Sequence, residues 1–60
     1  MYFEVFQGVN NFWYWRLYSS NLKKIAFCSE GFKSKKEAID GIATVKAIAA
    51  LAPIKELALN

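Results

Sequence analysis

The chain has 60 residues, of which 55% are hydrophobic and 17% aromatic, and its formal net charge is +3. A single cysteine excludes an internal disulfide. Because the chain has no histidine and its carboxylates lack calcium-loop spacing, we expect no metal site. We also expect no cofactor. A chain of this length forms one small domain, residues 1–60, that buries only about 60% of its unfolded surface. Its hydrophobic content exceeds that capacity. Since small domains compensate with disulfides, metals or oligomerisation, we expect a homodimer.

Three features predict a cytoplasmic protein that has no membrane segment. The single Cys28 is typical of a reducing compartment, and the first residues lack the basic and then apolar pattern of an export signal. The longest apolar stretch, residues 38–52, is interrupted by Asp40 and Lys46 and is too short to span a bilayer.

The first half of the chain predicts a three-stranded antiparallel meander. Residues 2–7 and 12–18 alternate as strands and are rich in strand-forming residues. The turn between them, Gly8–Asn11, contains residues that tolerate positive φ. A second turn at residues 19–21 leads to a third strand at residues 23–28.

The strand at residues 12–18 carries aromatic side chains on both faces. One face, which we expect the helix to cover, carries Trp13, Trp15 and Leu17. The opposite face combines two strands and carries Tyr2, Glu4, Phe6, Phe12, Tyr14, Arg16 and Tyr18. Antiparallel pairing predicts an ion pair between Glu4 and Arg16. The size of the aromatic patch favours packing against another subunit, and a ligand platform is the alternative.

The second half predicts one helix over residues 35–52. Ser34 and Glu37 form a capping box at its start, and Pro53 ends it. At 100° per residue, the stripe that should lie on the sheet consists of Ala38, Ile39, Ile42, Val45, Ala49 and Ala52. Gly41 costs about 1 kcal/mol against alanine in a helix. This cost indicates that the helix approaches another backbone closely at Gly41.

The tail at residues 54–59 is too apolar to remain unpaired. It contains Ile54, Leu57 and Leu59, and the preceding proline prevents a simple continuation of the helix. We expect it to return as a fourth strand that pairs with its own sheet or with the sheet of a neighbour. The predicted fold class is α+β with the element order β-β-β-α-β.

Short segments spread along nearly the whole chain have a recognisable order and spacing. They are Tyr2–Phe6, Trp13–Leu17, Asn21, Ile25–Ala26, Ser29–Phe32, Ser34–Lys35, Ala38, Gly41–Ile42 and Thr44–Lys46. Together they resemble the YegP-like family of small bacterial and archaeal proteins of unknown function. The resemblance implies that two units build one continuous antiparallel sheet and exchange their C-terminal strands. Because this chain has one unit, it implies the two-subunit form.

The chain departs from the family pattern at two positions near the second turn. Leu22 stands where the family tends to have a turn glycine, so the type of this turn does not follow from the resemblance. Lys24 replaces a residue that is usually apolar, which indicates a more exposed third strand.

No group of residues identifies an active site. Without histidine, a general base must be a carboxylate or a lysine, and Glu30 is the only acid that we expect in a loop beside a glycine. We therefore expect no enzyme. The favoured interpretation is a small cytoplasmic homodimeric binding module of unknown ligand. Its predicted interface consists of Tyr2, Phe6, Tyr14, Tyr18, Ile54, Leu57 and Leu59.

An alternative function is nonspecific binding of nucleic acid or phosphate at the start of the predicted helix. Exposed N–H groups and the helix macrodipole favour an anion there. The residues that we expect to bind it are Lys33, Ser34, Lys35, Lys36 and Arg16. Tyr14 and Tyr18 add stacking surface of the kind that single-strand binders use. The competing interpretation is an ordinary solvated charge cluster.

Overall fold

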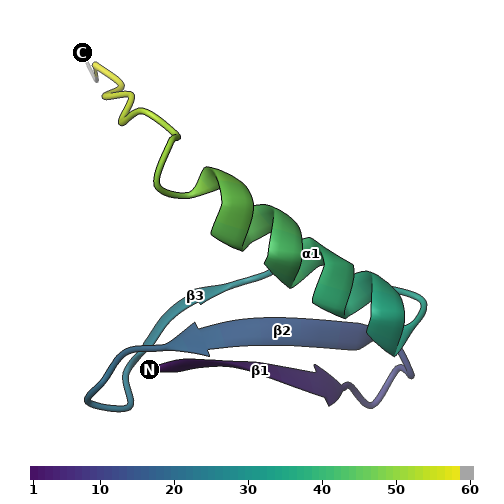
Figure 1. The fold of residues 1–60 in the computed structure, drawn as a ribbon. Coiled ribbons are helices and arrows are strands. Elements are labelled where there is room, and N and C mark those ends of the chain that lie inside the picture. Colours follow the sequence, from purple (N-terminus) through teal and green to yellow (C-terminus); the bar gives the residue numbers. More distant parts are fainter. Residues whose placement is uncertain (59–60) are drawn as a thin grey trace.

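A computed structural model describes residues 1–58 of the chain. It has an α+β fold in which one helix follows a three-stranded antiparallel sheet of order β1-β2-β3 (Figure 1). The elements are β1 (Tyr2–Gln7), β2 (Trp13–Tyr18), β3 (Lys24–Phe27) and α1 (Lys35–Ile48). The predicted α+β class and the order of these four elements are confirmed.

The β1–β2 hairpin has the register that the aromatic alternation requires. Phe3 pairs with Leu17 and Val5 with Trp15, so these four side chains share one face of the sheet. In the turn, the N–H of Asn11 donates to the carbonyl of Gly8 at 3.0 Å. Asn11 has a φ of 70°, which asparagine adopts more readily than most residues. The turn chemistry therefore agrees with the pairing of the strands.

A β-bulge modifies the pairing of β2 with β3. Leu17 pairs with Ala26, whereas Tyr18 pairs with Lys24, so Ile25 is the additional residue. The bulge places Lys24 opposite Tyr18. After β3 the chain continues along β2, because Trp13 and Phe32 exchange two backbone hydrogen bonds of 2.8 Å. The whole length of β2 is therefore flanked on both sides.

The core lies between α1 and one face of the sheet. Among the described residues only Trp15, Ala38 and Ile42 are buried. A Cβ atom at Gly41 would lie 3.0 Å from the Phe32 ring and 3.5 Å from Nε1 of Trp15. The helix therefore approaches aromatic side chains at Gly41, and the expectation of a close backbone is wrong.

The helix is shorter than predicted and leaves the sheet in its second half. It ends at Ile48, and hydrogen bonds of 3.0 and 2.9 Å from the N–H groups of Leu51 and Ala52 to the Ile48 carbonyl close a final turn. Along the predicted stripe, Ile39 is 46% exposed and Ala49 is exposed. Of the predicted stripe, only Ala38 and Ile42 are buried among the described residues, and the later part of α1 rises away from the sheet (Figure 1).

The tail projects from the end of α1 and lies apart from the sheet (Figure 1). Residues 54–58 form no strand in this single chain, and the remainder of the predicted strand, including Leu59, lies outside the described residues. The radius of gyration is 13.5 Å, whereas a compact domain of this length has about 10 Å. In the part of the chain that the structure describes, no helix is long and apolar enough to cross a membrane.

Leu22 generates the first prediction, because its backbone is left-handed, with a φ of 63°, and its side chain is 70% exposed. A residue with a Cβ atom loses roughly 1–2 kcal/mol in this conformation. We expect Leu22→Gly to stabilise the fold by about 0.5–1 kcal/mol after the entropy cost of glycine. Thermal unfolding at a fixed protein concentration should show a midpoint that is higher by about 2–8 °C.

Asn11→Gly is the matched control for this change. Asn11 has a similar φ of 70° in the other hairpin turn, but asparagine already tolerates that conformation. We expect its midpoint to stay near that of the wild type. A lower midpoint for Leu22→Gly would show that the left-handed backbone costs less at this turn than the chain entropy that glycine adds.

Candidate functional site

The sheet face opposite α1 has no covering element among residues 1–58 (Figure 1). We call this surface the open face. Its side chains come from alternating positions of β1 and β2 and from β3. They are Tyr2, Glu4, Phe6, Tyr14, Arg16, Tyr18, Lys24 and Phe27. Most of them are aromatic or cationic, and Glu4 is the one acid of the set.

Three cross-strand pairs form a ladder along the open face: Tyr2–Tyr18, Glu4–Arg16 and Phe6–Tyr14. The ring centroids of the two outer pairs are 5.2 and 5.7 Å apart, within the range of favourable aromatic contacts. In the central pair, Nε of Arg16 donates to Oε1 of Glu4 at 2.5 Å. This contact confirms the predicted ion pair.

Arg16 also contacts the aromatic rings on either side of the ion pair. Its guanidinium carbon lies 4.2 Å from the centroid of Phe6 and 5.8 Å from that of Tyr18, both within cation–π distance. The hydrogen bond to Glu4 raises the pKa of Arg16, so the guanidinium is charged at any physiological pH. Since only Nε is bonded among the described residues, the two terminal amino groups remain available to a ligand.

Tyr14 is held in place by the turns that surround it. Nδ2 of Asn10 donates to its hydroxyl at 2.8 Å. Two glycines lie against the ring, and a Cβ atom would be 2.8 Å from Cε1 of Tyr14 at Gly8 and 3.1 Å from Cζ at Gly31. These contacts fix the orientation of Tyr14. Sequence reasoning treated Gly8 and Asn10 only as turn-forming residues. Their position beside the aromatic strand was the available signal that they contact Tyr14.

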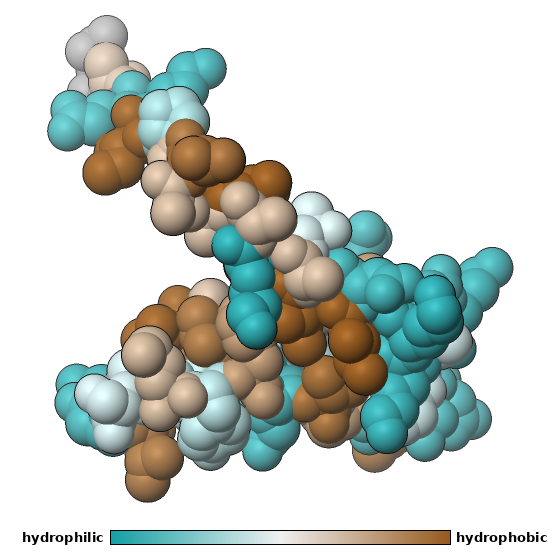
Figure 2. Space-filling model, viewed as in Figure 1, coloured by the Kyte–Doolittle hydropathy of each residue, from teal (hydrophilic) through white to brown (hydrophobic). Residues whose placement is uncertain are grey.

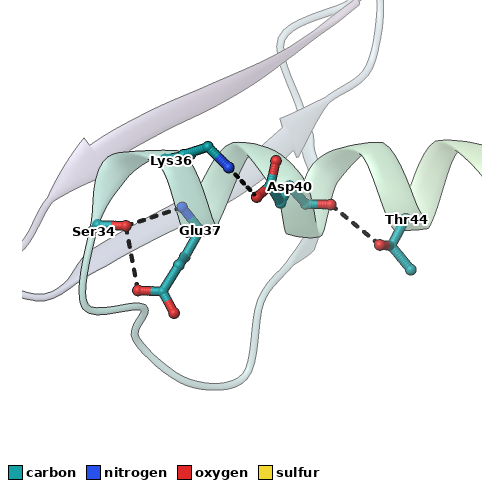
Figure 3. A network of polar contacts seen from close by, with 5 residues as sticks. All are labelled: Ser34, Lys36, Glu37, Asp40 and Thr44. Carbon is teal, nitrogen blue, oxygen red and sulfur yellow. Dashed lines mark hydrogen bonds and ion pairs between the residues drawn. The ribbon is translucent and has the colours of Figure 1, made fainter.

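The start of α1 uses its own side chains to satisfy its polar groups (Figure 3). Oγ of Ser34 accepts from the N–H of Glu37 at 3.1 Å and donates to Oε1 of Glu37 at 3.2 Å. Nζ of Lys36 forms an ion pair of 3.3 Å with Asp40. The serine half of the predicted capping box is therefore present, whereas Glu37 bonds the Ser34 hydroxyl in place of the Ser34 N–H, and its carboxylate occupies the first turn.

The predicted anion-binding residues do not gather in one place. Ser34 and Lys36 make the contacts just described, and Lys33 and Lys35 are exposed around the start of α1. Arg16 alternates with the buried Trp15, so it lies on the open face, away from α1. The structure thus separates the lysines from the guanidinium that was expected to assist them.

A second feature is a hollow of about 450 Å³ between the end of β3 and the middle of α1. Its lining includes Trp15, Cys28, Ser29, Glu30, Phe32 and Thr44. Sγ of Cys28 accepts from the Trp15 N–H at 3.3 Å, and Cys28 is partly exposed. Within residues 1–58 no three histidine, cysteine, aspartate or glutamate side chains gather into a metal site. Aromatic and polar side chains thus line the hollow together.

The predicted interface residues lie on two separate surfaces. Tyr2, Phe6, Tyr14 and Tyr18 belong to the open face. Ile54 and Leu57 lie on the projecting tail, 95% and 77% exposed, and Leu59 is outside the described residues. Because the tail continues from α1, it emerges on the covered side of the sheet (Figure 1). The two surfaces therefore face different directions.

Comparisons with known proteins agree with this architecture. The family model described as Domain of unknown function (DUF1508), the YegP-like domain, matches residues 9–56. An NMR solution structure of a protein from the archaeon Haloferax volcanii is similar, with 38% sequence identity, a TM-score of 0.85 and coverage of 93% of each chain. No curated protein matches the chain. The resemblance seen in the sequence is therefore confirmed.

Gly31 generates the second prediction. A Cβ atom there would lie 2.5 Å from Cβ of Phe12 and would press on the ring of Tyr14. We expect Gly31→Ala to destabilise the fold by about 1–3 kcal/mol, as overpacking usually does. Thermal unfolding should show a lower midpoint, and the ring resonances of Tyr14 should shift.

Ser29→Ala in the same loop serves as the control, because Ser29 is exposed. Its stability should stay within about 0.5 kcal/mol of the wild type. Equal stability of Gly31→Ala and the wild type would contradict the close packing around Tyr14.

Proposed function

The chain belongs to the DUF1508 family of domains of unknown function, and we propose that it is a small homodimeric binding module. The observation that supports this proposal is the amount of hydrophobic surface that one copy leaves exposed. In this proposal the module is not an enzyme, and it works in the reducing cytoplasm, where an unpaired cysteine such as Cys28 is common.

One copy has too little core for the surface that it presents. Three side chains are buried among the described residues, and the accessible surface of the chain is 5234 Å². A compact monomer of the same mass presents about 4,000 Å². The excess of roughly 1,200 Å² is larger than the approximately 800 Å² that one partner buries in a standard interface. The partner that we propose for this surface is a second copy of the same chain.

Part of this exposed hydrophobic surface lies at the end of α1 and along the tail. Ile48, Leu51, Ile54 and Leu57 are 54–95% exposed. Hydrophobic side chains line both the projecting arm and the sheet beneath it (Figure 2). Such a surface is unusual for a monomer and typical of an interface.

We infer that the tail of each copy lies along the β3 edge of the other, where it forms the fourth strand. The outer edge of β3 has unpaired backbone groups among the described residues, and an added strand would satisfy them. The hollow beside this edge offers apolar surface from Trp15 and Phe32. Exchange in both directions gives a two-fold interface and one continuous sheet.

The solution mass tests this proposal. Light scattering should give twice the 6.8 kDa of one chain. In the double substitution Ile54→Asp and Leu57→Asp, two aliphatic side chains worth about 1.5–3 kcal/mol each no longer enter the interface. We expect the dimer to dissociate more than about 100-fold more readily, with a lower unfolding midpoint.

Lys55→Asp is the matched control, because it makes the same change of net charge within the same segment. It should retain most of the dimer, since it removes no aliphatic contact. A wild-type mass of one chain would overturn the proposal, and so would equal dissociation of the control and the double variant.

A further inference from the structure

We propose that the open face binds single-stranded nucleic acid, with a base stacked on each of its two aromatic pairs and a phosphate at Arg16. Such binding rests on the function proposed above, because it supplies the ligand of the module. It requires neither the exchanged tail nor the lysines at the start of α1. The site is therefore distinct from the helix N-terminus that the sequence suggested.

The ladder places one aromatic pair on each side of Arg16, so a strand whose bases stack on both pairs would pass its backbone over the guanidinium. Tyr14 and Tyr18 are four residues apart on β2, which corresponds to about 13 Å along a strand. Arg16 stands midway between them, with its terminal amino groups free among the described contacts. Stacking on aromatic rings combined with a nearby cation is how proteins hold unpaired bases without regard to sequence.

The charge of the open face suits a polyanion. Arg16 and Lys24 carry positive charge, and Glu4 is the single acid that offsets them. Both cations lie over aromatic rings, with Nζ of Lys24 5.2 Å from the centroid of Phe27. The chain as a whole has a net charge of +3. Attraction to phosphate and stacking of bases are thus available on one surface.

Protein packing suits this face less well. Burying the Glu4–Arg16 pair in a dry interface would remove both charges from water, and their mutual attraction does not reliably offset that cost. The side chains of the pair are 39% and 33% exposed, and a phosphate would keep the guanidinium in a polar environment. The aliphatic side chains of the tail are also more exposed than this face: Ile54 is 95% and Leu57 77% exposed, whereas Tyr2 is 45% exposed. The stronger protein-binding surface is therefore the tail.

The ring of Tyr14 is already fixed before any ligand arrives. The hydrogen bond from Asn10 and the close contacts with Gly8 and Gly31 hold it in place. A surface that is ordered in advance loses little side-chain entropy on binding. Bases in a duplex are stacked on each other, so this surface selects single strands.

Fluorescence anisotropy with a labelled oligothymidylate of about 12 nucleotides provides the test. We expect binding that weakens between about 50 and 200 mM salt, because lysine and arginine contacts release counterions from phosphates. Tyr18→Leu keeps a strand-compatible side chain but removes the stacking ring. It should weaken binding by roughly 5- to 150-fold, whereas Lys35→Gln at the start of α1 should leave the affinity unchanged.

The wild-type protein gives an independent readout, so the test does not depend on how the variants fold. Titration followed by NMR should shift the ring resonances of Tyr2, Tyr14 and Tyr18. Shifts confined to Lys33–Lys36, equal affinity for a duplex, or no binding at low salt would each overturn the proposal. A change of solution mass in Tyr18→Leu with unaltered affinity would assign the face to another copy instead. A dimer that binds no oligonucleotide would leave the proposed homodimer standing and reject only the ligand.

Discussion

A sheet has two faces, and residues 1–58 form one helix with which to cover them. The helix covers the face that carries Trp15, and the two buried helix residues, Ala38 and Ile42, belong to that contact. Everything on the opposite face must therefore tolerate water or find a partner. The chain meets this constraint by pairing its exposed aromatic rings with each other and by placing an ion pair between them.

The strand register connects the two faces. Because side chains alternate along a strand, the pairing that places Val5 beside Trp15 under the helix also places Glu4 beside Arg16 on the open face. A slip of one residue would move the buried tryptophan into solvent and dismantle the ladder. Burial on one side thus stabilises the geometry of the exposed side, and a thin core still positions a defined surface.

Much of this arrangement follows from the sequence, and the exceptions have physical causes. Alternation and turn chemistry predict the three strands, the Glu4–Arg16 pair and the cap at Ser34 because these are local or depend on register. The helix stripe is predicted too long, since periodicity identifies an apolar face but not the point at which the sheet beneath it ends. Sequence reasoning also grouped Arg16 with the lysines, although alternation along residues 12–18 already places Arg16 on the sheet face opposite the predicted helix.

The two exposed surfaces differ in chemistry, and the difference favours a different role for each. The tail and the end of α1 expose aliphatic side chains without neighbouring rings, and such surface gains stability only by leaving water. The open face exposes rings, hydroxyls and cations that are already in contact with one another, so further burial in a dry interface gains less. In the proposed dimer, a second copy bound to the tail on the helix side would leave the open face accessible. Exchange of tails would also join two ladders in one sheet. A single-stranded nucleic acid long enough to contact both ladders would then gain affinity from its second contact without any new kind of interaction.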